Sequence, residues 1–293
     1  MTKSAAARPK GTSSLRGEKR TNQIVICVIL ALGTLTMIIP FWWMISTSFD
    51  GAVTVDSIPF PPRFYPLIPS IDNYRLAFSN VPMIKYIGNS LLVAVVNLVI
   101  AIFSAICAGY ALSKIPFKGR GAILMLALST MMIPGEVTMV SRFFLFQKLH
   151  LVNTYWAFWL PSFAYIFGTF FAKQYMDSIP TSLRESALMD GAGELRIAIQ
   201  IFMPLCGALV ATLAVLLFLG SWNDFMWPLL ILTSPKKYTL QVGVALFATN
   251  GGLSNQPGVR MACTCISIIP ILLVYLFLQR YIVESIALSG VKQ

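Results

Sequence analysis

Few residues of this chain are of the types that carry out bond chemistry. The chain has one histidine, His150, so it cannot build a histidine-based metal site or a catalytic triad. The five cysteines lie inside apolar runs without metal-ligand spacing, and a phosphate-binding G-x-x-x-x-G-K-[ST] loop is absent. We therefore expect no catalytic residue, no metal site and no cofactor in this chain. The cysteines are Cys27, Cys107, Cys206, Cys263 and Cys265.

The most informative polar segment lies between two apolar runs, at residues 178–196. Ser182 and Glu185 have the S-x-x-E spacing of a capping box, which predicts a short helix over Leu183–Asp190. Gly191 can adopt the left-handed conformation that ends such a helix. A second helix should follow and continue into the next apolar run. The segment is therefore predicted to be a bent pair of helices.

The same segment resembles the signature loop of the permease subunits of ATP-binding cassette (ABC) importers. In that family a glutamate is followed by a glycine six residues later, an isoleucine sixteen residues later and a proline nineteen residues later. Glu185, Gly191, Ile201 and Pro204 stand at these four offsets. Ser186 replaces the usual alanine, which is a change from one small residue to another. Four matched offsets make the resemblance specific.

The resemblance runs from about Asn73 to the end of the chain and is to sugar importers, including the smaller permease subunit of the maltose importer. Asn89-Ser90-Leu91 and Trp222-Asn223-Asp224 are among the matching stretches. The resemblance implies an all-α integral membrane protein with the type I ABC importer permease architecture and a cytoplasmic coupling helix. The residues that it assigns to ATPase coupling are Glu185, Ser186, Ala187, Asp190, Gly191, Ile201 and Pro204.

The resemblance also implies the partners of the chain. ATP and Mg²⁺ would be bound by a separate dimer of ATP-binding subunits. A second, homologous permease subunit would complete the pathway, and an extracytoplasmic solute-binding protein would deliver the cargo. We expect the cargo to be a sugar or oligosaccharide, either acidic and of the uronate or alginate type, or neutral and of the malto type.

The elements that position this loop are apolar helices. The chain is 57% hydrophobic and only 11% charged, whereas soluble domains carry about 25% charged residues. A helix needs about 20 apolar residues to cross the hydrocarbon core of a bilayer. Six stretches meet or nearly meet this length, which predicts six transmembrane helices. They are Ile24–Ser46, Ile87–Leu112, Gly121–Phe144, Leu151–Ala172, Ile201–Leu232 and Val259–Leu278.

The distribution of basic residues predicts the orientation of these spans. With the N-terminus inside, the cytoplasmic segments hold 14 of the 22 Lys and Arg residues and the outer segments hold 8. The positive-inside rule therefore places both termini in the cytoplasm of a bacterial inner membrane. We expect a basic cytoplasmic tail at residues 1–22 and a six-span domain at 23–293, with a permease core at about 85–282 and the coupling loop at about 177–204. We expect no nucleic acid partner, since lipid is the solvent that this composition favours.

Polar and aromatic side chains within the spans are candidates for the substrate path, because their exposure to lipid is costly. Ala101, Ala105 and Gly109 form a small-residue face that could pack within the chain or against a second permease. The substrate-path candidates are Asn89, Asn97, Tyr110, Glu136, Tyr155, Tyr165, Asn223 and Asp224.

Three other functions compete with a sugar importer. An ABC permease for another small solute would carry the same loop. A secondary transporter that uses an ion gradient would carry buried ionisable residues, but Glu136 and Asp224 are the only acids within the predicted spans and both lie toward outer ends. A membrane-embedded enzyme would need a metal or nucleophile constellation that the sequence lacks.

Overall fold

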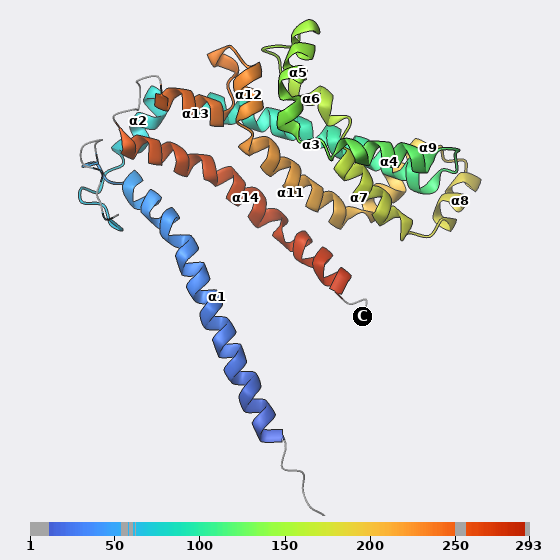
Figure 1. Ribbon diagram of the computed structural model, residues 1–293, viewed down its shortest axis with the longest axis horizontal. Helices are drawn as coiled ribbons and strands as arrows, with labels where there is room; N and C mark the ends of the chain where they lie inside the picture. Colours follow the sequence, from blue (N-terminus) through green and yellow to red (C-terminus); the bar gives the residue numbers. More distant parts are fainter. Residues whose placement is uncertain (1–11, 54–57, 59–60, 62, 250–255, 291–293) are drawn as a thin grey trace, which may run out of the picture.

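The computed structural model describes residues 12–53, 58, 61, 63–249 and 256–290. Within these residues the chain is almost entirely helical, and its only β-type pairing is a single bridge between Asp50 and Pro69. Figure 1 shows a body of helices with the long helix α1 directed away from it. Residues 1–11 of the predicted tail, and residues 54–57, 59–60, 62, 250–255 and 291–293 of the predicted membrane domain, lie outside the described residues.

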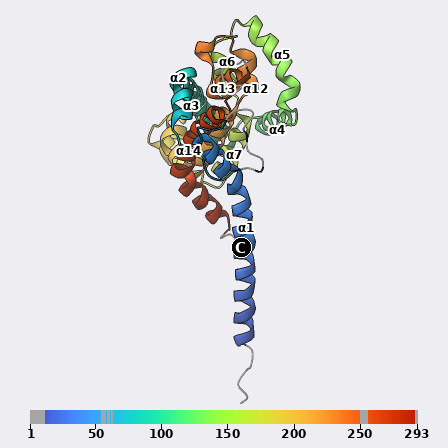
Figure 2. The ribbon, with the colours of Figure 1, turned by 90° about the vertical axis from the view of Figure 1, so that its left-hand side faces the viewer.

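Helix α1 (Thr12–Ser48) contains the first predicted span. Helix already begins at Thr12, so the predicted boundary between tail and span at residue 22 corresponds to no break. Its apolar window, within Gln23–Ser48, has none of its residues buried in the chain. Because apolar side chains face outward on all sides, lipid is the natural solvent for this helix. It contacts α14 near its C-terminal end (Figures 1 and 2).

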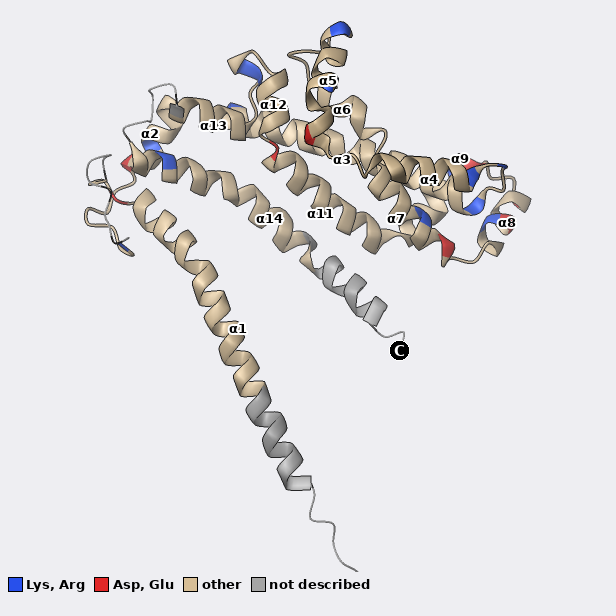
Figure 3. Cartoon of the chain, in the orientation of Figure 1, with Lys and Arg blue, Asp and Glu red and all other residues tan. Residues whose placement is uncertain are grey.

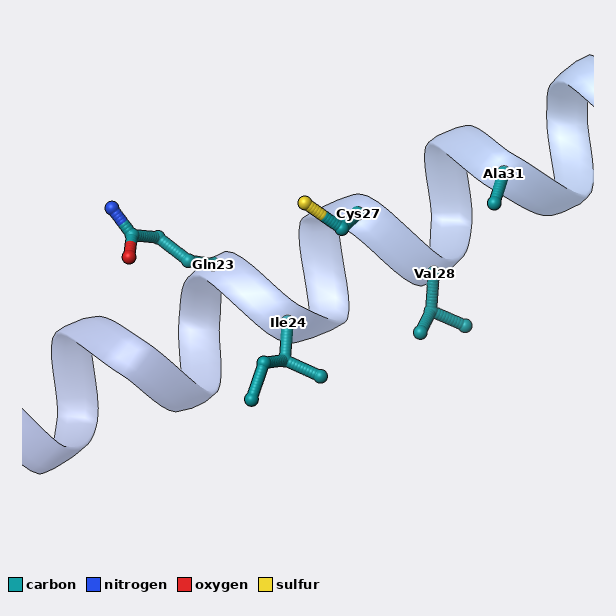
Figure 4. Close-up of a pocket in the computed structure, with 5 residues that line it drawn as sticks. All are labelled: Gln23, Ile24, Cys27, Val28 and Ala31. Carbon is teal, nitrogen blue, oxygen red and sulfur yellow. The ribbon is translucent and has the colours of Figure 1, made fainter.

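A cavity of about 600 Å³ lies beside α1, but it has the character of a lipid-facing surface. The described residues that line it are five neighbours on one face of this single helix, and all but Gln23 carry apolar or thiol side chains (Figure 4). No second described element contributes a polar group. We therefore assign no site to this cavity, whose lining residues are Gln23, Ile24, Cys27, Val28 and Ala31.

Helix α3 (Met83–Lys114) forms the centre of the body and contains the second predicted span. Its small-residue face packs within the chain, against α7 (Ile166–Asp177). A Cβ atom placed on Gly109 would lie 2.6 Å from the Cβ of Ala172, and one on Gly168 would lie 3.1 Å from the Cβ of Ala105. The two backbones approach so closely only because these positions lack side chains.

The third predicted span, Gly121–Phe144, is not one continuous helix. It is divided into α4 (Arg120–Thr130) and α5 (Gly135–Lys148), which are bent by 96°. Proline has no backbone N–H and disfavours helix in the residue before it, so Pro134 explains the break. Figure 2 shows α5 standing away from the rest of the body.

The fourth predicted span, Leu151–Ala172, is also wrong as a single helix. Residues 151–155 form turns, α6 (Trp156–Ser162) is short, and α7 begins only at Ile166. Pro161 lies in the last turn of α6, where the chain leaves the helix. The helix then extends five residues beyond the predicted end, to Asp177.

The fifth predicted span, Ile201–Leu232, consists of several pieces. It starts within the π-helical turn η2 (Ala198–Phe202), passes through α10 (Met203–Leu205) and bends by 86° into α11 (Gly207–Asn223). A further short helix, α12 (Met226–Ile231), follows Asp224. Length and apolarity therefore support three spanning helices in the described residues, or up to five if each bent pair counts as one span.

The remaining helices close the two ends of the body. The sixth predicted span lies within α14 (Pro257–Gly290). At one end, α14 packs with α2 (Asp72–Asn80), α3, α11 and α13 (Leu240–Thr249) around buried Trp222, and the 3₁₀ turn η3 (Pro235–Lys237) lies nearby. At the other end α3, α7 and α11 enclose a second cluster around Phe202, from which α8 (Ser182–Met189) and α9 (Glu194–Ile197) project.

Candidate functional site: the coupling elbow

Helices α8 and α9, with the turn between them, form a bent unit at one end of the body, which we call the coupling elbow (residues 181–197). Figure 3 shows charged residues gathered around it, while the middle of the body carries few. The capping box predicted at its start is wrong. Thr181 is the N-cap and Ser182 is already helical, with no side-chain cap bond. The helix still begins within one residue of the prediction because Pro180 precedes it.

The turn depends on Gly191. Its φ is +79°, in the left-handed region predicted from the sequence. The N–H of Gly191 donates to the carbonyl of Leu188 and the N–H of Ala192 donates to that of Ala187, both at 3.0 Å. These bonds satisfy carbonyl groups at the end of α8 and fix the direction in which the chain leaves it.

An ion pair then ties the two arms of the elbow together. The Arg184 guanidinium on α8 donates through Nη2 and Nε to the Glu194 carboxylate on α9. The hydroxyl group of Tyr110, near the end of α3, donates to Glu194 Oε2 at 2.5 Å. The bond from Arg184 holds the pKa of Glu194 below its ordinary value, against the opposing effect of burial, and the tyrosine adds to the lowering. One carboxylate therefore joins α8, α9 and α3.

A second set of bonds fixes the segment that leads into the elbow. Lys114 at the end of α3 donates to the carbonyl of Ile179 at 2.5 Å. Asp177 at the end of α7 accepts from Ser113 at 2.7 Å and from Lys173 at 2.6 Å. Burial raises the pKa of Asp177, but these two bonds outweigh it and leave the pKa below its ordinary value. The elbow is thereby connected to both α3 and α7.

Five of the predicted coupling residues lie in this unit and the other two follow directly after it. Glu185, Ser186 and Asp190 are exposed on α8 or just after it, whereas Ala187 is buried against the body. Ile201 lies half-buried in η2, and Pro204 is exposed in α10 at the base of the second arm. The elbow thus has an outward face of polar groups and an inward face that packs on the core.

The outward face also carries exposed apolar side chains. Met189 is 89% exposed, and Leu183 and Leu195 are exposed as well. A cavity of about 240 Å³ lies between the two arms, lined by six residues of both polar and apolar character. Exposed apolar groups next to a cavity are typical of a protein contact surface. The lining residues are Ala187, Asp190, Ala192, Arg196, Gln200 and Ile201.

The structure places four of the predicted substrate-path residues in bonds that hold helices or loops together. Asn89 donates to the carbonyl of Lys236 at 3.1 Å and to that of Tyr238 at 2.9 Å. Asn97 bonds with the side chains of Ser221 and Ser162. Tyr155 donates to the carbonyl of Lys237 at 3.4 Å, and Tyr110 lies at the coupling elbow as described above.

The other four lie elsewhere in the body. Tyr165 is half-buried beside Gly168, between α6 and α7. Glu136 is exposed in the first turn of α5, and Asn223 is exposed at the end of α11. Asp224, between α11 and α12, accepts from the N–H of Trp227. The eight candidates are therefore spread over the chain and do not converge on one site, and their role in a substrate path stays a prediction.

Sequence reasoning missed Arg184, Glu194 and Tyr110 as a linked group. Arg184 and Glu194 are ten residues apart on two helices, and Tyr110 lies in a distant span. The one local signal was the Gly191 turn, which must bring the two arms together. In the described part of the chain, no group of three or more His, Cys, Asp or Glu residues could hold a metal ion.

Comparison with known proteins identifies the chain. A family model described as "Binding-protein-dependent transport system inner membrane component" matches residues 101–287, more than half of the chain. The arabinooligosaccharides transport system permease protein AraQ of Halalkalibacterium halodurans is 33% identical over 279 residues, covering 94% of this chain and 99% of AraQ. The diacetylchitobiose uptake system permease protein NgcG of Streptomyces coelicolor is 31% identical over 267 residues, covering 88% of this chain and 85% of NgcG.

A solved structure supports the architecture. A chain in the crystal structure of a bacterial ABC transporter involved in the import of the acidic polysaccharide alginate superposes with a TM-score of 0.79 at 24% identity. The match covers 94% of this chain and 100% of that chain, and at this identity it shows the fold. The predicted all-α permease fold is confirmed, although the count of six spans is not. This chain belongs to the family of inner-membrane components of binding-protein-dependent transport systems, and it is a transport subunit and not an enzyme.

Proposed function

We propose that this chain is the permease subunit of an ATP-driven importer for a sugar or oligosaccharide, and that it receives mechanical work through the coupling elbow. The observation that carries the proposal is the bonding of Glu194 to both Arg184 and Tyr110. This network makes α8 and α9 one stiff unit attached to α3. A partner that pushed on the exposed face of α8 would therefore displace the end of a central helix and not merely deform a loop.

Separate ATP-binding subunits would supply this push. Glu185 and Met189 lie on the exposed face of α8, where a charged group and an apolar group can dock together. A second, homologous permease and an extracytoplasmic binding protein complete the proposed complex. The distribution of Lys and Arg supports a topology in which both termini and the elbow are cytoplasmic.

A carbohydrate cargo is supported by the names of the relatives, which are permeases for arabinooligosaccharides and for diacetylchitobiose. The Asn89-Ser90-Leu91 and Trp222-Asn223-Asp224 stretches favour the same class. Both an acidic uronate-type cargo and a neutral malto-type cargo fit these observations. The alternatives are an ABC permease for another small solute and a gradient-driven secondary transporter.

The proposal is tested by substitutions in the elbow. Glu185→Lys should reverse the charge of the docking face, and Gly191→Pro cannot adopt the positive φ of the turn. We expect both variants to insert in the membrane but to lose most ATP-driven sugar uptake and to retain less ATPase in a pull-down. Lys118→Glu, a charge reversal on another exposed loop, is the matched control and should transport normally.

Two results would contradict the proposal. Normal uptake by Glu185→Lys would remove the elbow from the coupling route. Uptake that continued without ATP and stopped when an ionophore dissipated the ion gradient would identify a secondary transporter instead.

A further inference from the structure

A cluster of polar and aromatic side chains lies where α5 meets α12, and it includes no residue of the coupling elbow. The guanidinium carbon of Arg142 on α5 lies 3.7 Å from the ring centroid of Trp227 on α12. Trp227 is itself fixed, because its indole N–H donates to the carbonyl of Ala157 at 3.2 Å and its ring contacts Phe146 edge-on. Arg142 therefore lies on a rigid aromatic surface, in a cation–π arrangement.

Arg142 has hydrogen-bonding capacity that the chain does not use. Its Nε atom is buried without a partner. Among the described residues its guanidinium group donates no hydrogen bond and forms no ion pair. A guanidinium group has five N–H donors, and leaving buried donors unpaired costs free energy. The Nη atoms are not among the buried unpaired atoms, so they are the donors that an acceptor from outside this chain can reach.

Asp224 supplies an acceptor beside these donors. One of its oxygens, Oδ1, accepts from the N–H of Trp227 at 3.4 Å, so the carboxylate is fixed at the start of α12. The second oxygen accepts from no described residue. The negative charge of Asp224 acts on Arg142, but the two side chains form no direct ion pair. The cluster thus presents unused donors and an unused acceptor side by side, with charges that balance.

A pair of neighbouring sugar hydroxyl groups has the chemistry that fits this cluster. One hydroxyl oxygen can accept from Arg142 while the other donates to Asp224. The carboxylate of a uronic acid would also bond with Arg142, but repulsion from Asp224 would offset this attraction, whereas neutral hydroxyl groups meet no such repulsion. Partly buried Tyr155 and Trp159 pack in the same cluster and add aromatic surface of the kind that covers the C–H faces of sugars.

We propose that Arg142 and Asp224 form a carbohydrate subsite for neutral hydroxyl groups of the cargo. This inference rests on the proposed function as a sugar importer and decides between its two cargo types in favour of the neutral one. Arg142 and Asp224 are specificity-determining residues in this subsite, and Trp227 is the positioning residue that holds them.

The test is a binding experiment with the complete transporter in nanodiscs, without the binding protein. Changes in tryptophan fluorescence would report binding of maltotriose, arabinotriose and trigalacturonate, the last being the acidic probe. We expect wild type to bind at least one neutral trisaccharide more tightly than trigalacturonate. Arg142→Gln should weaken that binding about tenfold or more, as expected for the loss of hydrogen bonds from a charged donor.

The decisive variant is Asp224→Asn, which removes the repulsive charge and leaves Arg142 in place. It should shift the preference toward trigalacturonate by about tenfold relative to the neutral probe. Arg75→Gln, at an exposed side chain of α2, is the matched control and should leave all three affinities unchanged. A role limited to packing would alter binding of the three probes equally, so that result would overturn the proposal.

Two other results would overturn it. These are a wild-type preference for trigalacturonate and an absence of binding by any of the three probes. A wild-type transporter could give either of these results and still show ATP-driven sugar uptake that is lost in Glu185→Lys. In that case the subsite is wrong while the proposed function stands. If wild type performs no ATP-driven sugar uptake, the proposed function itself fails.

Discussion

At the scale of single residues, the bonds of Glu194 decide how stiffly the coupling elbow is attached to the body. Arg184 reaches this carboxylate from α8 and Tyr110 reaches it from α3. Hydrogen bonds to charged groups contribute about 1.5–3 kcal/mol, and bonds within one network are not additive. The three side chains should therefore behave as one coupled unit.

A double-mutant cycle measures this coupling. Tyr110→Phe removes one donor to Glu194 and should destabilise the chain by about 1–2 kcal/mol, since Tyr110 is buried. Combined with Arg184→Met, the loss should differ from the sum of the single effects by about 0.5 kcal/mol or more. Thermal unfolding of the purified complex gives the stabilities. Tyr65→Phe, at an exposed tyrosine, is the control, and strict additivity would show that the network is not coupled.

Glu194 also determines how the stability of the coupling elbow depends on pH in the acid range. Because its folded-state pKa is lowered, ionised Glu194 stabilises the elbow at pH values above its ordinary pKa of 4.5, and this contribution is lost as the pH falls through the folded-state pKa. We expect sugar-stimulated ATPase activity to be insensitive to Glu194 titration between pH 5 and 8. Glu194→Gln should lower this activity over that whole range, as measured in proteoliposomes. A wild-type loss centred near pH 6 that vanishes in Glu194→Gln would contradict the assignment.

At the scale of helices, close packing against α7 fixes the position of α3. A Cβ atom on Gly109 would lie 2.6 Å from the Cβ of Ala172 and 2.9 Å from the backbone N of Lys173, and neither atom can move freely. Overpacking of this kind costs about 1–3 kcal/mol. Gly109→Ala should therefore lower the thermal inactivation midpoint of the complex, even though alanine is the better helix former.

Gly88, on the same helix, is the matched control for this substitution. It is exposed, and a Cβ atom there would meet nothing within 4 Å. Gly88→Ala should be neutral or stabilising by up to about 1 kcal/mol. Equal effects at the two positions would show that the α3–α7 contact does not determine stability.

Apolar length in the sequence predicted some of the observed helices correctly and others incorrectly. Apolar length located α1, α3 and α14, because each is long and continuous enough for composition to define it. It failed for the third, fourth and fifth spans. There Pro134 and Pro161 break helices inside apolar runs, and the chain bends by 86° at Cys206, between α10 and α11. A run of apolar residues indicates that a segment avoids water. It does not indicate where a helix within that segment breaks or in which direction the chain continues.

The coupling elbow shows the same limit at the level of side chains. Sequence reasoning predicted the turn at Gly191 because a positive φ has a residue preference of its own. It could not predict the contact of Glu194 with Tyr110, since that contact depends on how α3 and α9 pack, 84 positions apart in the chain. The small-residue face on α3 was recognised, but only the structure decided that it packs against α7.

At the scale of the whole molecule, charged residues gather at the two ends of the body, with fewer between them on and around α5 and α12 (Figure 3). The coupling elbow lies at one end, and α2, with the start of α14, lies at the other. This separation is what a chain needs if it spans a bilayer with the elbow on the basic, inner side. The bent pair of α4 and α5 is either one broken span or a re-entrant loop.

Single-cysteine labelling of a variant without the five native cysteines tests this topology. We expect Thr181→Cys and Lys118→Cys to react with a membrane-impermeant maleimide only after the cells are opened, and Lys236→Cys to react in intact spheroplasts. All three positions are exposed. Lys148→Cys, at the end of α5, is the critical position. Its reaction from outside shows that α4 and α5 together cross the membrane, because Lys118 and Lys148 then lie on opposite sides. Reaction of Lys148→Cys only from inside would make the pair a re-entrant loop, and reaction of Thr181→Cys from outside would remove the coupling elbow from the reach of any cytoplasmic ATPase.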